Sequence, residues 1–180
     1  MPPTTPDNIP GLVLGKESLL RLLAGQPPLV EELVAPEAQV QPNGIDLTVR
    51  EVALLGSSGQ LGDSEAERRL SQAMPLTFDA LGWVDLPPGT YLLTFNEIVN
   101  LPQDIMALGR TRSSLLRCGV ALHTAVWDAG YSGRSQALLT IYNPYGFRLR
   151  HNARVLQLVF FRLTEPTPHP YQGIYQGENK

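Results

Sequence analysis

The sequence predicts an all-β domain, a sandwich or a barrel, with one short helix in front of it. Sixteen prolines and sixteen glycines are scattered through the 180 residues, and both residue types disfavour long helices. One stretch repeats leucines at helical spacing, whereas five other runs are apolar or alternating and are bounded by turn-forming residues. Many short strands joined by turns are typical of sandwiches and barrels.

The helical stretch is KESLLRLLAG, residues 16–25. Its four central leucines fall on one stripe of a helix, and Gly25 supplies a stop signal. A helix this short is expected to serve as a lid or brace on the sheet rather than as part of a helical bundle.

The expected strands are, in chain order, GIDLTVREVALL (44–55), TYLLTFNEIVNLP (90–102), VALHTAVWD (120–128), SQALLTIYNP (135–144) and ARVLQLVFFRL (153–163). Residues 56–75 are polar and predict a surface excursion, with a helical turn at EAERRL. No internal repeat and no long linker divides the chain, so we expect a single domain over residues 1–180.

The two ends of the chain lack strand or helix patterns. Residues 1–11 have neither the basic nor the apolar region of a signal peptide and predict a flexible tail. Residues 164–180 form either a disordered end or an arm that orders on something. This segment has more side chains suited to making contacts than a solvated tail requires, namely Tyr171, Tyr175 and Gln176.

Composition limits the possible functions. The single cysteine excludes an intrachain disulfide, and no apolar run approaches the ~18 residues of a membrane span, so a soluble, cytoplasmic protein is expected. A net charge of −3 gives no general attraction to a polyanion, which disfavours DNA or RNA binding. Charged residues are 17% of the chain, below the usual ~25%, which favours an oligomer whose surface partly lies against other subunits.

RTRSSLLRCG, residues 110–119, concentrates arginines and serines in a chain that is poor in charge. Arg112 and Arg117 can each bind two phosphate oxygens, and Ser113 and Ser114 add hydroxyl donors, particularly if they begin a helical turn. The segment is therefore a candidate anion site. The alternative is that Ser113 is only a helix N-cap beside surface arginines.

AVWDAGYSG, residues 125–133, contains a second candidate, Asp128. Taken alone, this aspartate is explained by a strand end, where its side chain would bond local backbone N–H groups near Gly130 and Gly133. A serine hydrolase using Ser113 or Ser114 is disfavoured because no G-x-S-x-G elbow surrounds either serine. The three histidines are widely spread and the lone cysteine has no C-x-x-C partner, which disfavours zinc.

Five ordered motifs resemble the dUTPase and dCTP deaminase superfamily, and within it most closely the archaeal-type dUTPases. They are PNGIDL (42–47), RSSLLR (112–117), WDAGYSG (127–133), NARVLQLVFF (152–161) and YQGIYQGE (171–178). The resemblance spans roughly residues 40–178. It implies a distorted jelly-roll β-barrel, assembled as a homotrimer with active sites at the subunit interfaces.

The resemblance also implies site roles. Residues matching the phosphate-binding motif, the arginine after it and the motif glutamine are Arg112, Ser113, Ser114, Arg117 and Gln157. Asp46 matches the aspartate that supports the phosphate and Mg²⁺ region, acting on the metal indirectly through water or phosphate. Asp128 matches the base that orients and deprotonates the attacking water, shielded from bulk water by Val126 and Trp127.

The implied reaction is the hydrolysis of dUTP to dUMP and pyrophosphate, with Mg²⁺ travelling on the triphosphate. Tyr131 matches the aromatic ring beneath the deoxyribose, which leaves no room for a 2′-hydroxyl. Main-chain groups of the hairpin at residues 120–126 are expected to recognise uracil. Tyr171, Tyr175 and Gln176 would belong to an arm that covers the bound triphosphate.

The sequence departs from the deaminase branch at two places, and these departures bear on the alternatives to a dUTPase. Thr140 stands where the deaminases have a catalytic glutamate, and threonine cannot shuttle a proton to the pyrimidine ring at neutral pH. The carboxylate of Glu97 could instead reach the pyrimidine ring in place of that glutamate. Ile174 and Glu178 stand where deaminases tend to show lysine and glutamine. The alternatives to a dUTPase are thus a dCTP deaminase, a bifunctional enzyme, or a non-catalytic nucleotide-binding regulator, which an intact Asp128 disfavours.

Overall fold

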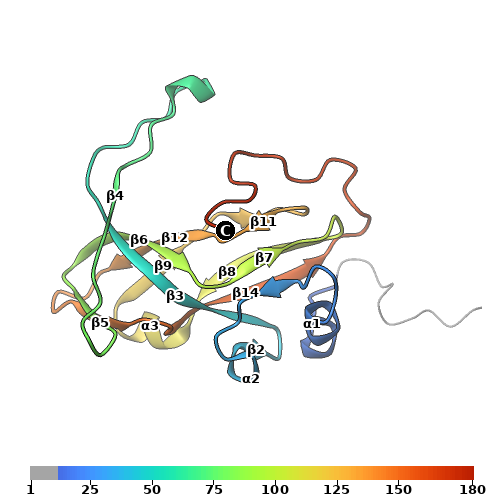
Figure 1. Ribbon diagram of the computed structural model, residues 1–180, viewed down its shortest axis with the longest axis horizontal. Helices are drawn as coiled ribbons and strands as arrows, with labels where there is room; N and C mark the ends of the chain where they lie inside the picture. The colour runs from blue at the N-terminus through green and yellow to red at the C-terminus, as the bar shows by residue number, and fades with distance from the viewer. Residues whose placement is uncertain (1–11) are drawn as a thin grey trace, which may run out of the picture.

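The all-β prediction is confirmed by a computed structural model, which describes residues 12–180 (Figure 1). The expected tail at residues 1–11 lies outside this range. The main sheet is antiparallel and curls into a half-barrel. Its strands, in spatial order, are β10 (Val126–Trp127), β8 (Ile105–Thr111), β14 (Arg154–Arg162), β3 (Gly44–Leu55), β6 (Gly89–Phe95), β12 (Gln136–Ile141) and β9 (Val120–His123).

Shorter strands complete the β-structure of residues 12–180. The strands β2 (Val40–Gln41) and β4 (Ala73–Pro75) each pair with β3. A second sheet is formed by β1 (Val30–Glu31), β7 (Ile98–Asn100) and β11 (Ser132–Gly133), and a third by β13 (Phe147–Arg150) and β5 (Trp83–Leu86).

The predicted helix at residues 16–25 is confirmed as α1 (Lys16–Leu23), and it buries Leu19 completely. Two further short helices, α2 (Pro36–Gln39) and α3 (Ser113–Arg117), add to the single helix of the predicted fold. The helical turn anticipated at EAERRL is a 3₁₀ turn, Glu65–Glu67. Because α2 and α3 span only about one turn each, neither leaves the repeating apolar stripe that identifies a longer helix.

The expected strand 44–55 coincides with β3, whereas two other expected strands each divide into two. Residues 90–102 supply β6 of the main sheet and β7 of the second sheet, and residues 120–128 supply β9 and β10. The strand β8 was not predicted. Its second half contains Gly109 and Arg110, which interrupt the apolar alternation and run directly into the anion segment of the sequence.

The core is built around β3, the central strand of the main sheet. This strand pairs with β14 on one side, where Leu47 faces Leu156, and with β6 on the other, where Val52 faces Leu93. All four of these side chains are fully buried. Residues in the first half of β3 therefore occupy the most enclosed part of the molecule, and Asp46 is one of them.

Two segments leave this body. The excursion that joins β3 to β4 projects away from the sheets with the 3₁₀ turn at its tip, and Leu61 there is 77% exposed (Figure 1). Residues 164–180 run in the opposite sense, back across the molecule to end beside β11 (Figure 1). Across residues 12–180, no helix is long and apolar enough to cross a membrane.

Candidate functional site

The first group of predicted site residues lies where β3, β14 and β8 run side by side. Gln157 on β14 is opposite Asp46 on β3 and opposite Arg110 on β8. The close approach of β3 to β14 depends on Gly44, because a Cβ at this position would lie 2.5 Å from the carbonyl oxygen of Leu158. The PNGIDL motif thus sets the strand spacing that presents Asp46 beside Gln157.

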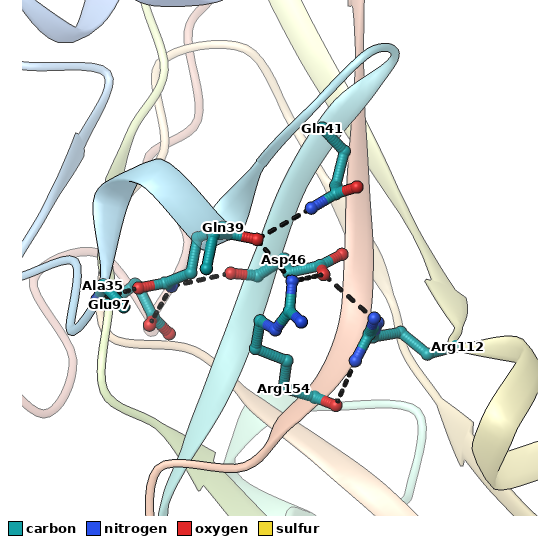
Figure 2. A network of polar contacts seen from close by, with 8 residues as sticks. Ala35, Gln39, Gln41, Asp46, Glu97, Arg112 and Arg154 are labelled. Atoms are coloured by element: carbon teal, nitrogen blue, oxygen red, sulfur yellow. Dashed lines mark hydrogen bonds and ion pairs between the residues drawn. The ribbon is translucent and has the colours of Figure 1, made fainter.

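Asp46 binds two arginines in a group that we call the arginine cluster (Asp46, Arg112 and Arg154). The carboxylate side chain is 2% exposed, and its Oδ2 lies 3.1 Å from Nε of Arg112 and 3.3 Å from Nη1 of Arg154 (Figure 2). Burial raises the pKa of Asp46, while the two guanidiniums act in the opposite direction. Both arginine side chains remain about one-third exposed, at 29% and 34%, so each can also meet an anion from solvent.

The two serines stand beside this cluster at the start of α3. The N-cap residue of α3 is Arg112, with no side-chain capping bond, so the interpretation of Ser113 as the N-cap is wrong. The hydroxyls of Ser113 and Ser114 are exposed and form no hydrogen bond to any residue that the structure describes. Arg117 is also exposed, and buried Leu115 fastens the helix to the core.

A cavity of about 600 Å³, here called the hairpin pocket, holds the second group of site residues. It lies between β12, the excursion, the C-terminal segment and the stretch from β9 to β10, the predicted hairpin, whose two strands pair with β12 and β8 rather than with each other. Its polar and aromatic lining residues are Ser71, His123, Trp127, Asp128, Tyr131, Ser135, Gln136, Tyr171, Tyr175 and Glu178.

Asp128 lines the hairpin pocket directly after β10. Its carboxylate makes no hydrogen bond within residues 12–180, so the expectation of side-chain bonding in a strand-end turn is wrong. The expected shielding is also absent from the single chain. Asp128 is exposed, Val126 is 48% exposed, and Trp127 turns into the core, where its Nε1 donates to Oγ of Ser135 at 3.0 Å.

Tyr131 forms the buried wall of the pocket. Its hydroxyl donates to Oε1 of Glu178 at 2.8 Å, and its ring meets Tyr171 edge-on with centroids 5.7 Å apart. Burial raises the pKa of Tyr131, and the hydrogen bond to Glu178 raises it further. Burial also raises the pKa of Glu178, while the hydrogen bond from Tyr131 acts in the opposite direction.

The C-terminal segment is docked on the turn between β10 and β11 of its own chain. Gln176 accepts a hydrogen bond from the Ser132 N–H at 2.8 Å and donates to the Gly130 carbonyl at 2.9 Å. Gly130 has a φ of +88°, and a Cβ there would lie 2.4 Å from Pro170. Gln176 therefore holds the main chain of this turn and does not line the pocket, unlike Tyr171 and Tyr175.

Thr140 stands on the same face of β12 as Gln136 and Leu138, two positions beyond the residues that line the pocket. The proposal that Glu97 reaches the site as a substitute carboxylate is wrong. Glu97 is fully buried and accepts hydrogen bonds from Thr48 and a glutamine of α2.

Sequence reasoning missed Arg154 and the pocket role of Glu178. Arg154 stands at the start of β14, opposite Thr48 in β3, so it lies beside the PNGIDL strand. An arginine at the first position of a strand that otherwise reads as core is the signal that could have identified it. Glu178 was noted only as a departure from the deaminase pattern.

The residues that could hold a metal ion are few. Within the described range, no three histidine, cysteine, aspartate or glutamate side chains come together as a metal site. Asp46 is already paired with two guanidiniums, which makes it a poor direct ligand. This donor set does not fit a resident metal cage, and it is compatible with a cation that arrives bound to a phosphate ligand.

Residues 13–163 match the family described as dCTP deaminase-like. The chain belongs to this family. It is 46% identical over 167 residues to a probable deoxyuridine 5′-triphosphate nucleotidohydrolase of Methanosarcina mazei, covering 93% of this chain and 98% of that protein. Its identity to the protein of the same name from Archaeoglobus fulgidus is 45% over 160 residues, covering 89% and 94%.

The fold of this dCTP deaminase-like chain is similar to that of a solved 2′-deoxycytidine 5′-triphosphate deaminase from Agrobacterium tumefaciens. The TM-score is 0.66 at 21% identity, and the match covers 86% of this chain and 49% of that one. The chain thus spans about half the length of that deaminase, and at this identity the likeness concerns the fold alone.

A single dCTP deaminase-like chain presents its site residues as two separate groups. The hairpin pocket contains Asp128, Tyr131 and the two arm tyrosines, and none of the phosphate-site candidates lines it. The latter gather around the arginine cluster and α3. The structure brings together residues within each group, and it does not bring the two groups into one cavity.

Proposed function

We propose that this protein is a cytoplasmic dUTP diphosphatase, which hydrolyses dUTP to dUMP and pyrophosphate. The archaeal relatives at 45–46% identity bear the name of this activity and match along nearly their full length. The observation that carries the proposal is the carboxylate of Asp128, which lines a nucleoside-sized pocket and has no hydrogen bond to a described residue. A general base needs this freedom to bind water.

In the proposed mechanism, Asp128 takes a proton from a water molecule whose oxygen attacks the α-phosphorus. The bond from that phosphorus to the bridging oxygen breaks, and the electron pair leaves on pyrophosphate. A positioned base contributes roughly 10²–10⁴-fold to such a step. Arg112 and Arg117, with the serine hydroxyls and Gln157, would stabilise the negative charge on the departing pyrophosphate.

Mg²⁺ enters this scheme as part of the substrate. The ion would screen the triphosphate, and the arginine cluster would bind the phosphate oxygens that the ion leaves open. Asp46 would act on the metal only through water or phosphate, because its carboxylate faces Arg112 and Arg154.

A homotrimer would join the two groups of site residues across subunit interfaces. Supporting this, Leu108 on β8 and Val126 on β10 stand directly opposite one another and are 38% and 48% exposed. An exposed apolar pair beside the base is suited to contact with a second copy. The proposal requires that the molecular mass in solution be three times that of the chain, and that trimer and activity be lost together on dilution.

The second candidate is dCTP deamination, alone or coupled to hydrolysis, which the deaminase-like family assignment favours. Thr140 argues against it, because no proton-shuttling group stands at that position. Incubation with dUTP and dCTP in separate reactions containing Mg²⁺, followed by identification of products, tests both. If dUTP yields dUMP and pyrophosphate and dCTP is unchanged, the result supports the diphosphatase. If dCTP yields deoxyuridine nucleotides, the result supports the deaminase. Binding without turnover of either would leave a nucleotide-binding regulator.

A further inference from the structure

Glu97 is a buried carboxylate that the proposed reaction does not use. It is 0% exposed, lies between β6 and β7, and forms no ion pair in the described chain. Its Oε2 accepts from the Thr48 N–H at 2.9 Å, and its Oε1 accepts from the Thr48 hydroxyl at 2.5 Å and from Nε2 of Gln39 at 2.7 Å. Enclosing a carboxylate without a cation is costly, so hydrogen bonds alone must compensate it.

The directions of these hydrogen bonds require both carboxylate oxygens of Glu97 to act as acceptors. Nδ2 of Asn96 donates to Oγ1 of Thr48 at 2.9 Å, and the Thr48 hydroxyl in turn donates its own hydrogen to Glu97. The other two donors, a backbone N–H and an amide NH₂, cannot reverse. A carboxylate satisfies all three donors, whereas a glutamine at position 97 would place an NH₂ group against at least one of them.

Gln39 connects Glu97 to the arginine cluster. Nε2 of this fully buried side chain donates both to Glu97 and to the main-chain carbonyl of Asp46, the latter at 2.8 Å. Its Oε1 accepts from the Ala35 N–H at 2.7 Å, which fixes the start of α2. Figure 2 shows Glu97 and Arg112 at opposite ends of one series of polar contacts that passes through Gln39 and Asp46.

Arg154, the second arginine of the cluster, is held by the residue next to Gln39 in α2. Nη1 of Arg154 donates to the carbonyl of Ala38, the residue before Gln39 in α2, as well as to Asp46. Nη1 of Arg112 in turn donates to the carbonyl of Arg154 at 3.1 Å. Arg154 therefore takes its position from Ala38 and Asp46, which lie beside Gln39, and Arg112 takes its position from Asp46 and the main chain of Arg154.

We propose that Glu97 is a positioning residue for triphosphate binding, which through Gln39 fixes the main chain at Asp46 and the orientation of Arg112 and Arg154. The inference rests on the proposed function, since it assigns the arginine cluster to the phosphates. Glu97 itself does not touch the substrate. Its removal should therefore weaken ligands in proportion to their β- and γ-phosphates and leave the nucleoside contacts unchanged.

The test compares two affinities in one preparation. Glu97→Gln is expected to weaken binding of a non-hydrolysable dUTP analogue by about tenfold, the effect of misaligning one charge-assisted contact. Binding of dUMP should change less than twofold. The ratio of the two dissociation constants does not depend on the fraction of folded protein, so a general loss of structure would not move it. An unchanged ratio overturns the proposal.

Three further variants sharpen the result. Leu86→Ala removes a buried side chain on β5 and serves as the control for lowered stability; a shifted ratio there would also overturn the proposal. Gln39→Met keeps both Thr48 bonds to Glu97 and cuts the connection to Asp46, so it should shift the ratio like Glu97→Gln, even if the latter does not fold. A normal ratio in Gln39→Met excludes the route through Gln39.

Arg112→Lys distinguishes failure of the positioning role from failure of the proposed function. Lysine cannot reproduce the forked contact of arginine, so triphosphate affinity should fall. If Arg112→Lys shifts the ratio and Glu97→Gln does not, only the positioning role fails. If Arg112→Lys itself has no effect, the assignment of the arginine cluster to the triphosphate fails with it.

Discussion

The arginine cluster and the hairpin pocket are held in place by different means. Asp46 lies in the central strand of the sheet, and buried hydrogen bonds through Gln39 and Glu97 fix it from behind. The pocket around Asp128 is built from a turn, a projecting excursion and a docked C-terminal segment. In the proposed function, a pre-organised site suits the highly charged phosphates, whereas a site made of loops can close around the nucleoside.

The largest expected effect is a loss of turnover in a variant that leaves the structure of both regions unchanged. Asp128→Asn keeps size but cannot accept a proton, so kcat should fall by about 10²-fold or more. Because the carboxylate makes no hydrogen bond within residues 12–180, the melting temperature and the affinity for a non-hydrolysable dUTP analogue should stay unchanged. Turnover within a few-fold of normal would show that Asp128 is only a turn residue.

The second prediction concerns the pre-organised region. Asp46→Asn removes the charge that aligns two arginines, so we expect a loss of about 2 kcal/mol in unfolding free energy and roughly tenfold weaker triphosphate binding. Urea unfolding and titration with the analogue measure the two effects. Gln157→Ala, on the neighbouring strand, should weaken binding with a much smaller stability loss. Equal stability of Asp46→Asn and the unchanged protein would contradict the structural role of the ion pairs.

The third prediction concerns the docked segment. Deleting residues 170–180 removes the contacts of Gln176 and Glu178 with Ser132 and Tyr131, so kcat/KM for dUTP should fall several-fold. If the segment were ordered only by nucleotide, the deletion would leave the melting temperature of the empty protein unchanged, whereas loss of the docking seen here should lower it by a few degrees. Melting curves with and without the analogue separate these cases, and full activity after truncation would exclude a covering role.

The smallest expected effect is a pH dependence of docking. Burial against Tyr131 raises the pKa of Glu178 above its ordinary value of 4.5, so the docked state binds the proton more tightly than the free segment. Docking is therefore strongest below that ordinary value and weakens as pH rises through the raised pKa. Amide exchange of residues 171–178, corrected for intrinsic rates between about pH 5 and pH 8, should show this trend. Glu178→Gln should abolish it; an identical trend in that variant would assign it to another group.

The two regions also differ in how far the sequence could predict them. Local patterns sufficed for α1 and β3, because apolar spacing and flanking glycines determine such elements within a few residues. Motif resemblance identified Asp46, Arg112 and Asp128. The pairing of Gln39 with Glu97 spans 58 positions and depends on which strands become neighbours, so no local pattern contains it. Docking of Gln176 on the turn at Gly130 and Ser132 could not be predicted from the sequence for the same reason.

The excursion gives the pocket one wall whose sequence can change with little loss of stability. Leu55, Leu70 and Ser71 line the cavity from a projecting ribbon, while Ala137 and Leu138 line it from the sheet. Lengthening or rewriting a surface loop costs only a few tenths of a kcal/mol in closure entropy, whereas substitutions in a core strand disturb close packing. Altered base or sugar selectivity is therefore most accessible to evolution or engineering through residues 56–72, which share the pocket with Asp128 but contain none of the proposed catalytic or phosphate-binding residues.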